Sequence, residues 1–210
     1  MLKDLASKSL EDFTDVLASK SPVPGGGGAA ALVGALGVAL CSMVGNYTTG
    51  KKTYAAVEDD VQRMLAEAKS VRLRLLGLVR EDAEAFFPLS KAYAIPRDNP
   101  RRAKTLEEAT KGACHAPLEM MRQICSAIEL LEEMGQKGSR MLLSDVGCGA
   151  LLCRAALEAA SLNVLVNTKS LADRDFARAT EEEVDAMLAE YCPRAEECAQ
   201  HVTSKIRNNT

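Results

Sequence analysis

The sequence predicts an all-α protein: a single-domain bundle of about six helices, some long and bent by proline, around a central Ala/Gly-rich helix. Hydrophobic residues make up 47% of the 210 residues, yet only 4% are aromatic and none is Trp, so Ala, Leu, Val and Met must fill the interior. Apolar residues recur at helical spacing over long stretches, and no segment alternates as a half-buried strand does. We expect residues 1–210 to form one domain.

A short helix is predicted first. Ser9 supplies its N-cap. Four apolar residues then share one helical face: Leu10, Phe13, Val16 and Leu17. A loop rich in proline and glycine, from Ser21 to Gly28, separates this helix from the next.

The central helix is predicted within the charge-free run from Ser21 to Gly50, whose centre, from Ala29 to Val44, is apolar. Its Gly37, Cys41 and Gly45 recur at intervals of four and form a smooth ridge that permits close helix contact. A membrane span and a buried helix would both present such a ridge. The apolar core is shorter than the roughly 20 residues that a bilayer requires, and it has no aromatic belt, which favours the buried helix and argues against a membrane.

Two long amphipathic helices follow. The first runs from about Thr53 to Ala94 and ends at a turn from Ile95 to Pro100. Its apolar residues keep helical register: Val61, Met64, Ala68, Val71, Leu75, Leu78 and Val79. The second is predicted from about Arg101 to Met134, interrupted at Pro117, and the glycines of 135–138 end it.

Two further helices complete the predicted bundle. Ser144 is expected to cap a fifth helix, which extends to about Thr168 and is apolar nearly all round, as suits the middle of a bundle. Thr180 and Glu183 form a capping box for a last helix, which bends at Pro193.

The charge balance excludes several classes of partner. Lys and Arg number 26 against 29 Asp and Glu, a net charge of -3, so no general basic field exists for nucleic acid or an anionic membrane. The 7 cysteines lack the close spacing of a zinc or redox site, and residues 1–4 lack the apolar core of a signal peptide. We therefore expect a reduced, cytoplasmic protein with no metal site, since His115 and His201 are too few for one.

Asp82 is the polar residue that breaks the pattern. At 100° per residue it falls in the middle of the apolar stripe of the third helix, whereas Glu81 and Glu84 point sideways or away. A desolvated carboxyl has a raised pKa, which is useful for proton transfer at neutral pH. A buried salt bridge or a cap to another helix is the structural alternative, and the sequence pattern alone favours neither.

Other polar groups admit two interpretations each. Asn163 and Asn167 share a face of the fifth helix and either hydrogen-bond a heterocycle or tie the helix to its neighbours. Ser144 and Asp145 are explained by helix capping and the helix dipole.

The glycine run before the central helix also admits two interpretations. It lets a ligand approach the free N–H groups of a helix start, or it is a flexible connection. Lys51 and Lys52 form a small basic cluster that is either solvated or binds a carboxylate tail.

The order of these motifs resembles the cyclodeaminase/cyclohydrolase family of tetrahydrofolate enzymes. The resemblance covers nearly the whole chain and rests on order and spacing. Its motifs are Pro24-Gly25-Gly26-Gly27, Ser42-Met43-Val44, Gly50-Lys51-Lys52, Asp82-Ala83-Glu84-Ala85-Phe86, Pro96-Arg97-Asp98, Pro117-Leu118, Ser144-Asp145 and the stretch from Asn163 to Asn167. Gly28 departs from the family pattern, which has Ser there and so a hydroxyl that this chain lacks.

The resemblance implies a homodimeric helical enzyme acting on one-carbon units carried by tetrahydrofolate. It assigns the acid/base role to Asp82, the residue that the helical register also selects. By position it assigns the folate pocket to Pro24, Gly25, Gly26, Gly27, Gly28, Ser144, Asp145 and Asn163, with Lys51 and Lys52 for the glutamate tail of a polyglutamylated substrate. It implies no cofactor beyond the tetrahydrofolate substrate.

Two activities belong to that family. One hydrolyses 5,10-methenyltetrahydrofolate to the 10-formyl form, and the other closes 5-formiminotetrahydrofolate to the methenyl form with loss of ammonia. One carboxyl can serve both, because both pass through a tetrahedral carbon between two nitrogens. We expect no attached formiminotransferase domain, and this favours the cyclohydrolase. A non-catalytic folate-binding protein and a helical bundle serving only protein interaction are the alternatives.

Overall fold

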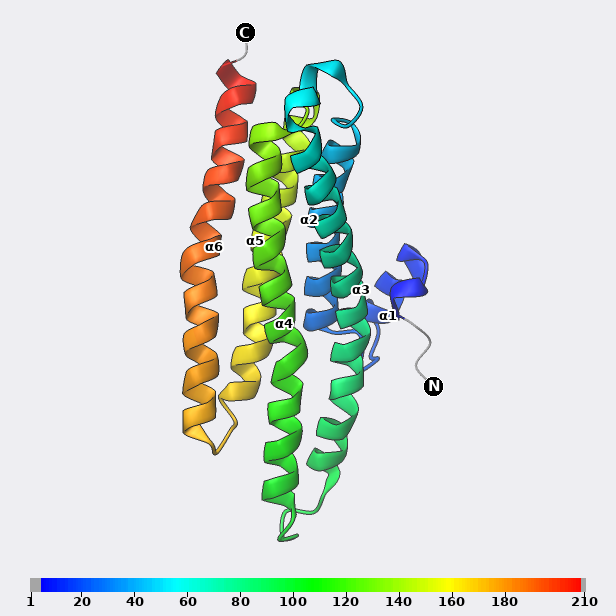
Figure 1. Cartoon of the computed structure of the whole chain (residues 1–210). Coiled ribbons are helices and arrows are strands. Elements are labelled where there is room, and N and C mark those ends of the chain that lie inside the picture. The colour runs from blue at the N-terminus through cyan, green and yellow to red at the C-terminus, as the bar shows by residue number, and fades with distance from the viewer. Residues whose placement is uncertain (1–4, 209–210) are drawn as a thin grey trace.

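The computed structural model describes residues 5–208, and every regular element in this range is helical, as predicted. Figure 1 shows the bundle. In chain order the elements are η1 (Leu5–Ser7), α1 (Leu10–Ala18), α2 (Gly26–Asn46), η2 (Lys52–Val57), α3 (Glu58–Ala94), α4 (Arg102–Lys137), η3 (Arg140–Leu142), α5 (Leu143–Thr168) and α6 (Arg174–Asn208). The N-cap prediction at Ser9 is confirmed, because its hydroxyl accepts the Asp12 N–H at 3.0 Å.

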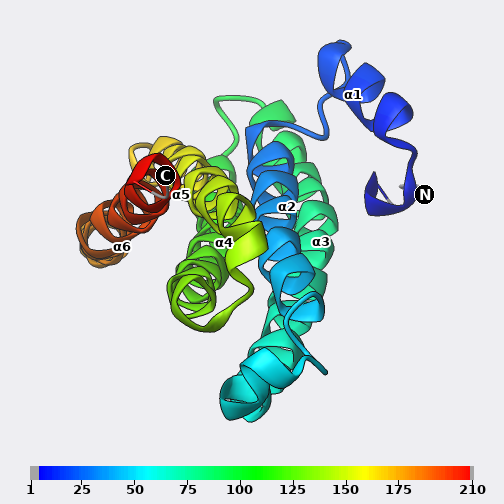
Figure 2. The ribbon, with the colours of Figure 1, turned by 90° about the horizontal axis from the view of Figure 1, so that it is seen from above.

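Five long helices run side by side. α2 packs between α3 and α5, α4 packs against α2, α3, α5 and α6, and α6 also packs on α5. In the view of Figure 1, α4 lies in front of α2 and α5, while Figure 2 shows α1 standing off beside α3. The core contains side chains from all five helices, and the largest include Met64, Leu75, Met120, Ile128 and Leu157.

Small residues bring α2 and α5 into close contact, as the ridge on the central helix predicts. A Cβ atom on Gly37 would lie 3.0 Å from the backbone oxygen of Gly149, and one on Gly149 would lie 2.9 Å from that of Gly37. Neither position has room for a side chain. By length and composition alone, α2 and the segment Arg140–Thr168 could cross a membrane; here both are packed in the bundle, with 56% and 44% of those windows buried.

Several predicted helix ends are wrong. α6 begins at Arg174, because Asp173 caps it by accepting the Phe176 N–H at 3.1 Å. Thr180 is therefore buried inside the helix, where its hydroxyl donates to the Phe176 carbonyl at 2.9 Å. The capping box predicted at Thr180 does not form.

The start of α5 also differs from the prediction. η3 leads directly into it, so Ser144 is an exposed residue of the first turn and makes no capping hydrogen bond. α2 begins at Gly26, so three of the four glycines predicted to lie in a loop belong to a helix. Pro117 lies inside a continuous α4, which does not break there.

Candidate functional site

A cavity of about 170 Å³ lies where the first turn of α2 meets α3 and α5. Its lining comes from four parts of the chain, which are separated in the sequence and meet at one level of the bundle. The lining residues are Pro22, Val23, Gly25, Gly26, Gly27, Asp82, Ala85, Phe86, Leu89, Ala113, Asn163, Val166 and Asn167. Polar groups from α3, α5 and the α2 backbone therefore face an otherwise apolar enclosure.

Asp82 reaches from α3 to the start of α2. A Cβ on Gly27 would lie 2.6 and 2.7 Å from the two Asp82 carboxyl oxygens, so the carboxyl occupies the space that a side chain at position 27 would take. The Gly28 N–H donates to this carboxyl. Burial raises the pKa of Asp82, and the Gly28 hydrogen bond opposes the rise because it favours the ionised form. The group is thus placed both to hold and to release a proton.

The glycine run is the first turn of α2 and its N-cap. Gly25 is the N-cap, and no side chain caps the helix. The N–H groups of Gly26 and Gly27 precede the first intrahelical hydrogen bonds and are directed out of the helix end, where the helix dipole favours negative charge. Lacking side chains, these residues let Asp82 and Asn163 approach: the Asn163 Oδ1 lies 3.4 Å from a Cβ position on Gly26.

Gly28 acts through its backbone. The residue is buried, and a Cβ there would lie 3.1 Å from the Pro24 Cβ and 3.7 Å from a Val79 methyl. The hydroxyl that the family pattern places at this position is absent here, and the main-chain N–H of Gly28 donates to the Asp82 carboxyl.

Asn163 and Asn167 place two amides on the α5 side of the cavity. Asn163 Nδ2 donates to the Ala159 carbonyl at 2.8 Å. Asn167 Nδ2 donates to the carbonyls of Ala113 at 3.2 Å and Asn163 at 2.9 Å. Asn167 therefore ties α5 to α4, whereas Asn163 bonds within its own helix. Both also line the cavity, and their hydrogen bonding to a heterocycle stays a prediction.

The apolar wall of the cavity is not among the pocket residues that the sequence predicts. Phe86 and Leu89 extend the face of α3 that carries Asp82, while Pro22, Val23 and Val166 complete the enclosure. The signal was present, because positions 82, 86 and 89 have helical spacing and share one face.

The other predicted pocket residues lie at the opposite end of the bundle. Ser144 and Asp145 are 19 and 18 residues before Asn163 on the continuous α5, which separates them from it by about 28 Å at 1.5 Å per residue. Lys51 and Lys52 follow the C-terminal end of α2 and are exposed. A single chain therefore brings Asp82, Gly25, Gly26, Gly27 and Asn163 to the cavity, whereas Pro24 and Gly28 are adjacent to its lining but not part of it. Ser144, Asp145, Lys51 and Lys52 lie outside the cavity.

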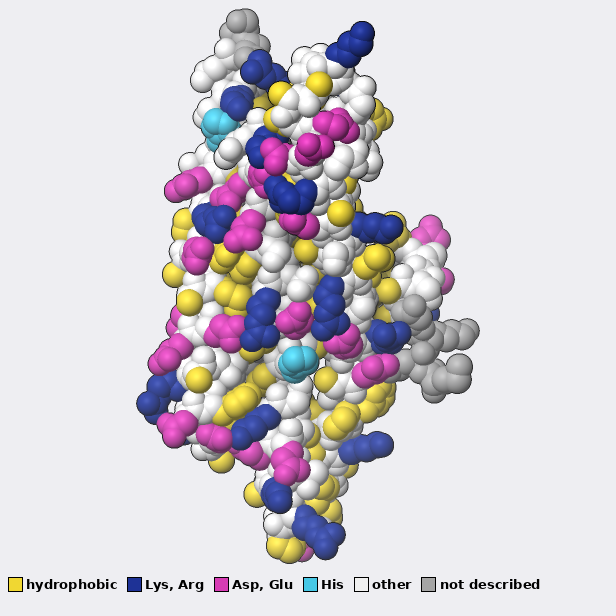
Figure 3. Space-filling model, in the orientation of Figure 1, with side chains coloured by type: hydrophobic (Ala, Val, Ile, Leu, Met, Phe, Trp, Pro, Cys, Tyr) yellow, Lys and Arg dark blue, Asp and Glu magenta, His cyan; other side chains and the backbone are white. Residues whose placement is uncertain are grey.

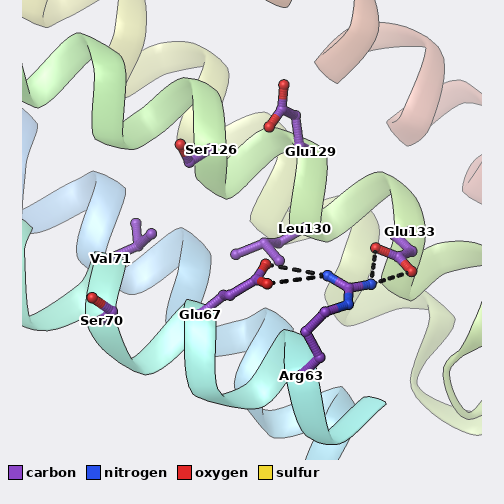
Figure 4. Close-up of a pocket in the computed structure, with 8 residues that line it drawn as sticks. All are labelled: Arg63, Glu67, Ser70, Val71, Ser126, Glu129, Leu130 and Glu133. Atoms are coloured by element: carbon purple, nitrogen blue, oxygen red, sulfur yellow. Dashed lines mark hydrogen bonds and ion pairs between the residues drawn. The ribbon is translucent and has the colours of Figure 1, made fainter. Parts of the chain in front are cut away.

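A larger cavity of about 330 Å³ lies between α3 and α4, and Figure 4 shows its lining. Arg63 lies between two carboxylates there and donates to Glu133 at 2.6 and 2.7 Å and to Glu67 at 3.2 and 3.3 Å. The Glu129 carboxylate on the same lining accepts from the Tyr191 hydroxyl at 2.7 Å, so every charged side chain of this cavity is paired.

Cysteines and metal-binding groups lie outside the Asp82 cavity. All 7 cysteines are free, and burial raises the pKa of the Cys41 thiol to about 12, which keeps it protonated and unreactive. Within residues 5–208, no group of three or more His, Cys, Asp or Glu side chains is arranged to hold a metal ion.

Comparison with known proteins gives consistent matches over most of the chain. A family model described as formiminotransferase-cyclodeaminase matches residues 9–186. The methenyltetrahydrofolate cyclohydrolase of Methylorubrum extorquens is 41% identical over 204 residues, which cover 95% of this chain and 98% of that protein.

Two further relatives carry the other activity in their names. The formimidoyltransferase-cyclodeaminase of Mus musculus is 31% identical over 192 residues, which cover 90% of this chain but 36% of that protein. The crystal structure of formiminotetrahydrofolate cyclodeaminase from Thermotoga maritima matches with a TM-score of 0.84 and 33% identity, over 94% of this chain and 95% of that one.

Proposed function

Because the chain belongs to the formiminotransferase-cyclodeaminase family, we propose that it is a 5,10-methenyltetrahydrofolate cyclohydrolase with Asp82 as general acid/base. One observation carries the proposal: the Asp82 carboxyl lies against the bare backbone of Gly27 in a cavity that also presents two amides. The cyclohydrolase name belongs to a relative that this chain matches over nearly its whole length, which favours this activity.

In the proposed hydrolysis, Asp82 first takes a proton from water and later gives it to N5. Ionised Asp82 takes a proton from water as the water oxygen bonds to the methenyl carbon between N5 and N10. The carbon becomes tetrahedral and Asp82 returns the proton to N5. The bond from that carbon to N5 then breaks as the hydroxyl oxygen forms the carbonyl and releases its proton to solvent, and the formyl group stays on N10. The Gly28 N–H stabilises the carboxylate before attack, while burial favours its protonated form afterwards.

A cyclodeaminase is the second candidate, favoured by the names of the mouse and Thermotoga relatives. N10 would attack the formimino carbon while protonated Asp82 donates to the imino nitrogen. The proton released by N10 then passes to that nitrogen, which leaves as ammonia as the methenyl ring closes. The raised pKa of Asp82 supports this reaction too, because it increases the fraction of molecules in which the carboxyl is protonated.

The test supplies the purified protein with each substrate separately. We expect the absorbance of 5,10-methenyltetrahydrofolate to disappear faster than in buffer, with no ammonia released. Formation of the methenyl absorbance from the formimino substrate, with stoichiometric ammonia and no accelerated hydrolysis, would select the cyclodeaminase. Turnover of neither substrate would overturn both.

A homodimer is part of the proposal. α5 exposes a stripe that is largely apolar along its whole length, consisting of Ser144, Cys148, Leu151, Ala155, Glu158, Leu162 and Val166. Leu162 and Val166 are 66% and 67% exposed, and Leu36 on the adjacent α2 is 48% exposed. By contrast, the face in Figure 3 carries mixed Lys, Arg, Asp and Glu, with ion pairs joining α3, α4 and α6. The apolar stripe is the face suited to a second copy.

The spacing of the stripe supports a two-fold axis at Ala155. Antiparallel pairing of two α5 helices about that residue sets Ser144 opposite Val166 of the second copy, and Cys148 opposite Leu162. Val166 lines the Asp82 cavity, so Ser144 and Asp145 of one copy would reach the cavity of the other. Lys51 and Lys52 would follow, because the Tyr54 hydroxyl accepts the Arg140 N–H and ties η2 to η3. The four residues left outside the cavity in one chain are thus proposed to serve the neighbouring copy.

Light scattering tests this assembly. The wild type should have twice the mass of one chain, and Leu162→Glu should be a folded monomer because the contact would desolvate the new charge. A monomeric wild type would overturn the dimer.

The proposal includes no cofactor besides the tetrahydrofolate substrate and no metal, and a cytoplasmic location consistent with free cysteines. Dialysis against a chelator should leave the rate unchanged. A rate lost on dialysis and restored by a metal ion would contradict that part.

A further inference from the structure

Pro117 and Asn167 are linked by one hydrogen bond. Proline has no N–H, so within α4 the carbonyl four residues before Pro117, that of Ala113, loses its intrahelical donor. Asn167 Nδ2 on α5 donates to this carbonyl at 3.2 Å. The backbone group that the proline frees is therefore bonded by a side chain that lines the Asp82 cavity.

This bond fixes the orientation of the Asn167 amide. Its two N–H groups go to two carbonyls, of Ala113 and Asn163, and a flipped amide would set its oxygen against both. Within residues 5–208 no group donates to the Oδ1 atom of Asn167, and no fully buried side-chain oxygen there lacks a hydrogen-bond partner. Oδ1 is consequently accessible, on a residue that lines the cavity, and acts there only as an acceptor.

Asn163 differs in this respect. Its Nδ2 donates once, to Ala159, so one N–H and the oxygen remain free for a ligand. Asn163 can thus donate or accept, whereas Asn167 can only accept. The pair gives the α5 wall one adaptable group and one of fixed polarity.

We propose that Asn167 is a specificity-determining residue whose Oδ1 accepts an N–H from the ligand's heterocycle, and that Pro117 is its positioning residue. The inference rests on the proposed function, since the pteridine ring of a tetrahydrofolate offers N–H donors on its ring nitrogens and exocyclic amine. A ring that presents a lone pair at this point meets the oxygen of Asn167 and is rejected.

The experiment measures kcat and KM for 5,10-methenyltetrahydrofolate in three variants. Asn167→Ala should raise KM about tenfold with kcat within about twofold, because it removes a hydrogen bond made equally in the bound and transition states. Pro117→Ala supplies a competing intrahelical donor and should raise KM by less. The double variant should match Asn167→Ala, because Pro117 acts through Asn167.

Pro193→Ala is the matched control. It changes an equivalent internal proline in α6, and the carbonyl that Pro193 frees belongs to exposed Ala189, outside the cavity. Its KM should equal that of the wild type. All variants are checked for cooperative thermal unfolding, and if Asn167→Ala does not fold, Asn167→Ser replaces it.

The outcomes separate this inference from the proposed function. Wild-type turnover with an unchanged KM in the folded Asn167 variant overturns the inference alone, as does a Pro117 effect that adds fully to that of Asn167. A fall in kcat with no change in KM would assign Asn167 a role other than ligand selection. No turnover by the wild type overturns the proposed function instead.

Discussion

The two ends of α5 contrast in how their polar groups are held. At the C-terminal end, the amides of Asn163 and Asn167 bond to backbone carbonyls, and Asp82 is fixed against Gly27. At the N-terminal end, Ser144 is exposed and makes no capping bond, although Ser144-Asp145 is a family motif just as the stretch from Asn163 to Asn167 is. The first end is preorganised within one chain, and the second acquires a function only against another surface.

The most damaging change at the preorganised end is Asp82→Asn. We expect cyclohydrolase activity to fall by about 1,000-fold, within the range for loss of a general acid/base. The unfolding temperature at pH 7 should be equal or higher: burial raises the folded-state pKa, so ionised Asp82 costs stability above that pKa and neutral Asn does not. Glu84→Gln, an exposed site two residues away, should retain wild-type activity. Near-normal turnover by Asp82→Asn would end the mechanism.

Gly27→Ala tests the contact that fixes Asp82. The new Cβ would lie 2.6 Å from a carboxyl oxygen, so the side chain must move, and a displacement of about 1 Å costs roughly 100-fold in rate. Stability should change little, because the atoms that yield are the end of a side chain. Gly77→Ala on α3 is the control, since nothing lies within 4 Å of its added Cβ. Equal activity in both variants would contradict the role of the glycine.

Mixing two inactive variants tests whether the ends meet between copies. Asp82→Asn and Ser144→Trp each disable both sites of a homodimer. After denaturation together and refolding, half of the dimers are mixed and one of the two sites in each is intact, so about a quarter of wild-type activity should return. Absence of any recovery, with mixed dimers demonstrated by mass, would show that the N-terminal end of α5 does not serve the partner's cavity.

The pH dependence of kcat/KM distinguishes the two candidate reactions at the same carboxyl. Hydrolysis uses ionised Asp82, so its rate should fall as pH drops through the raised pKa of that group. Ring closure with loss of ammonia uses the protonated form, so its rate should fall as pH rises through it. Stopped-flow absorbance from pH 4 to 9, a range of about 5 units around neutrality, measures both limbs. A flat profile in the wild type would exclude proton transfer by Asp82 as the limiting step.

The smallest expected effect is at Lys51 and Lys52. Replacing both by Gln should raise KM for a polyglutamylated substrate by about two- to fivefold, as befits exposed ion pairs, and the change should shrink at high salt. The monoglutamate serves as the comparison within the experiment. Equal effects on both substrates would remove the glutamate tail as their partner.

The fold followed from the sequence because period and composition act over many residues. Helical register placed Asp82 inside the bundle, and the glycine ridge of α2 anticipated its contact with α5. Helix ends were less predictable. Asp173 and Thr180 both have capping side chains, and only the packing that buries Thr180 decides between them.

Only part of the site could be predicted, and the reason differs from the one that applies to the helix ends. Motifs that neighbour one another in a family pattern need not meet in one chain, and a straight helix of 26 residues holds Ser144 and Asn163 apart. The role of Asn167 depends on a carbonyl freed in another helix, by Pro117, which no local pattern around either residue reveals.

The contact between Gly37 and Gly149 has a mechanical consequence. Because their backbones are in contact at Gly37 and Gly149, α2 and α5 cannot slide or rotate past one another without a steric clash. The two helices therefore behave as one rigid unit. Gly27 and Asn163 lie at one end of this rigid unit, so the distance between them stays constant as the ligand enters. Amide hydrogens in the middle of both helices should therefore exchange more slowly than those of α1. The movement that admits the ligand must occur in segments outside α2 and α5.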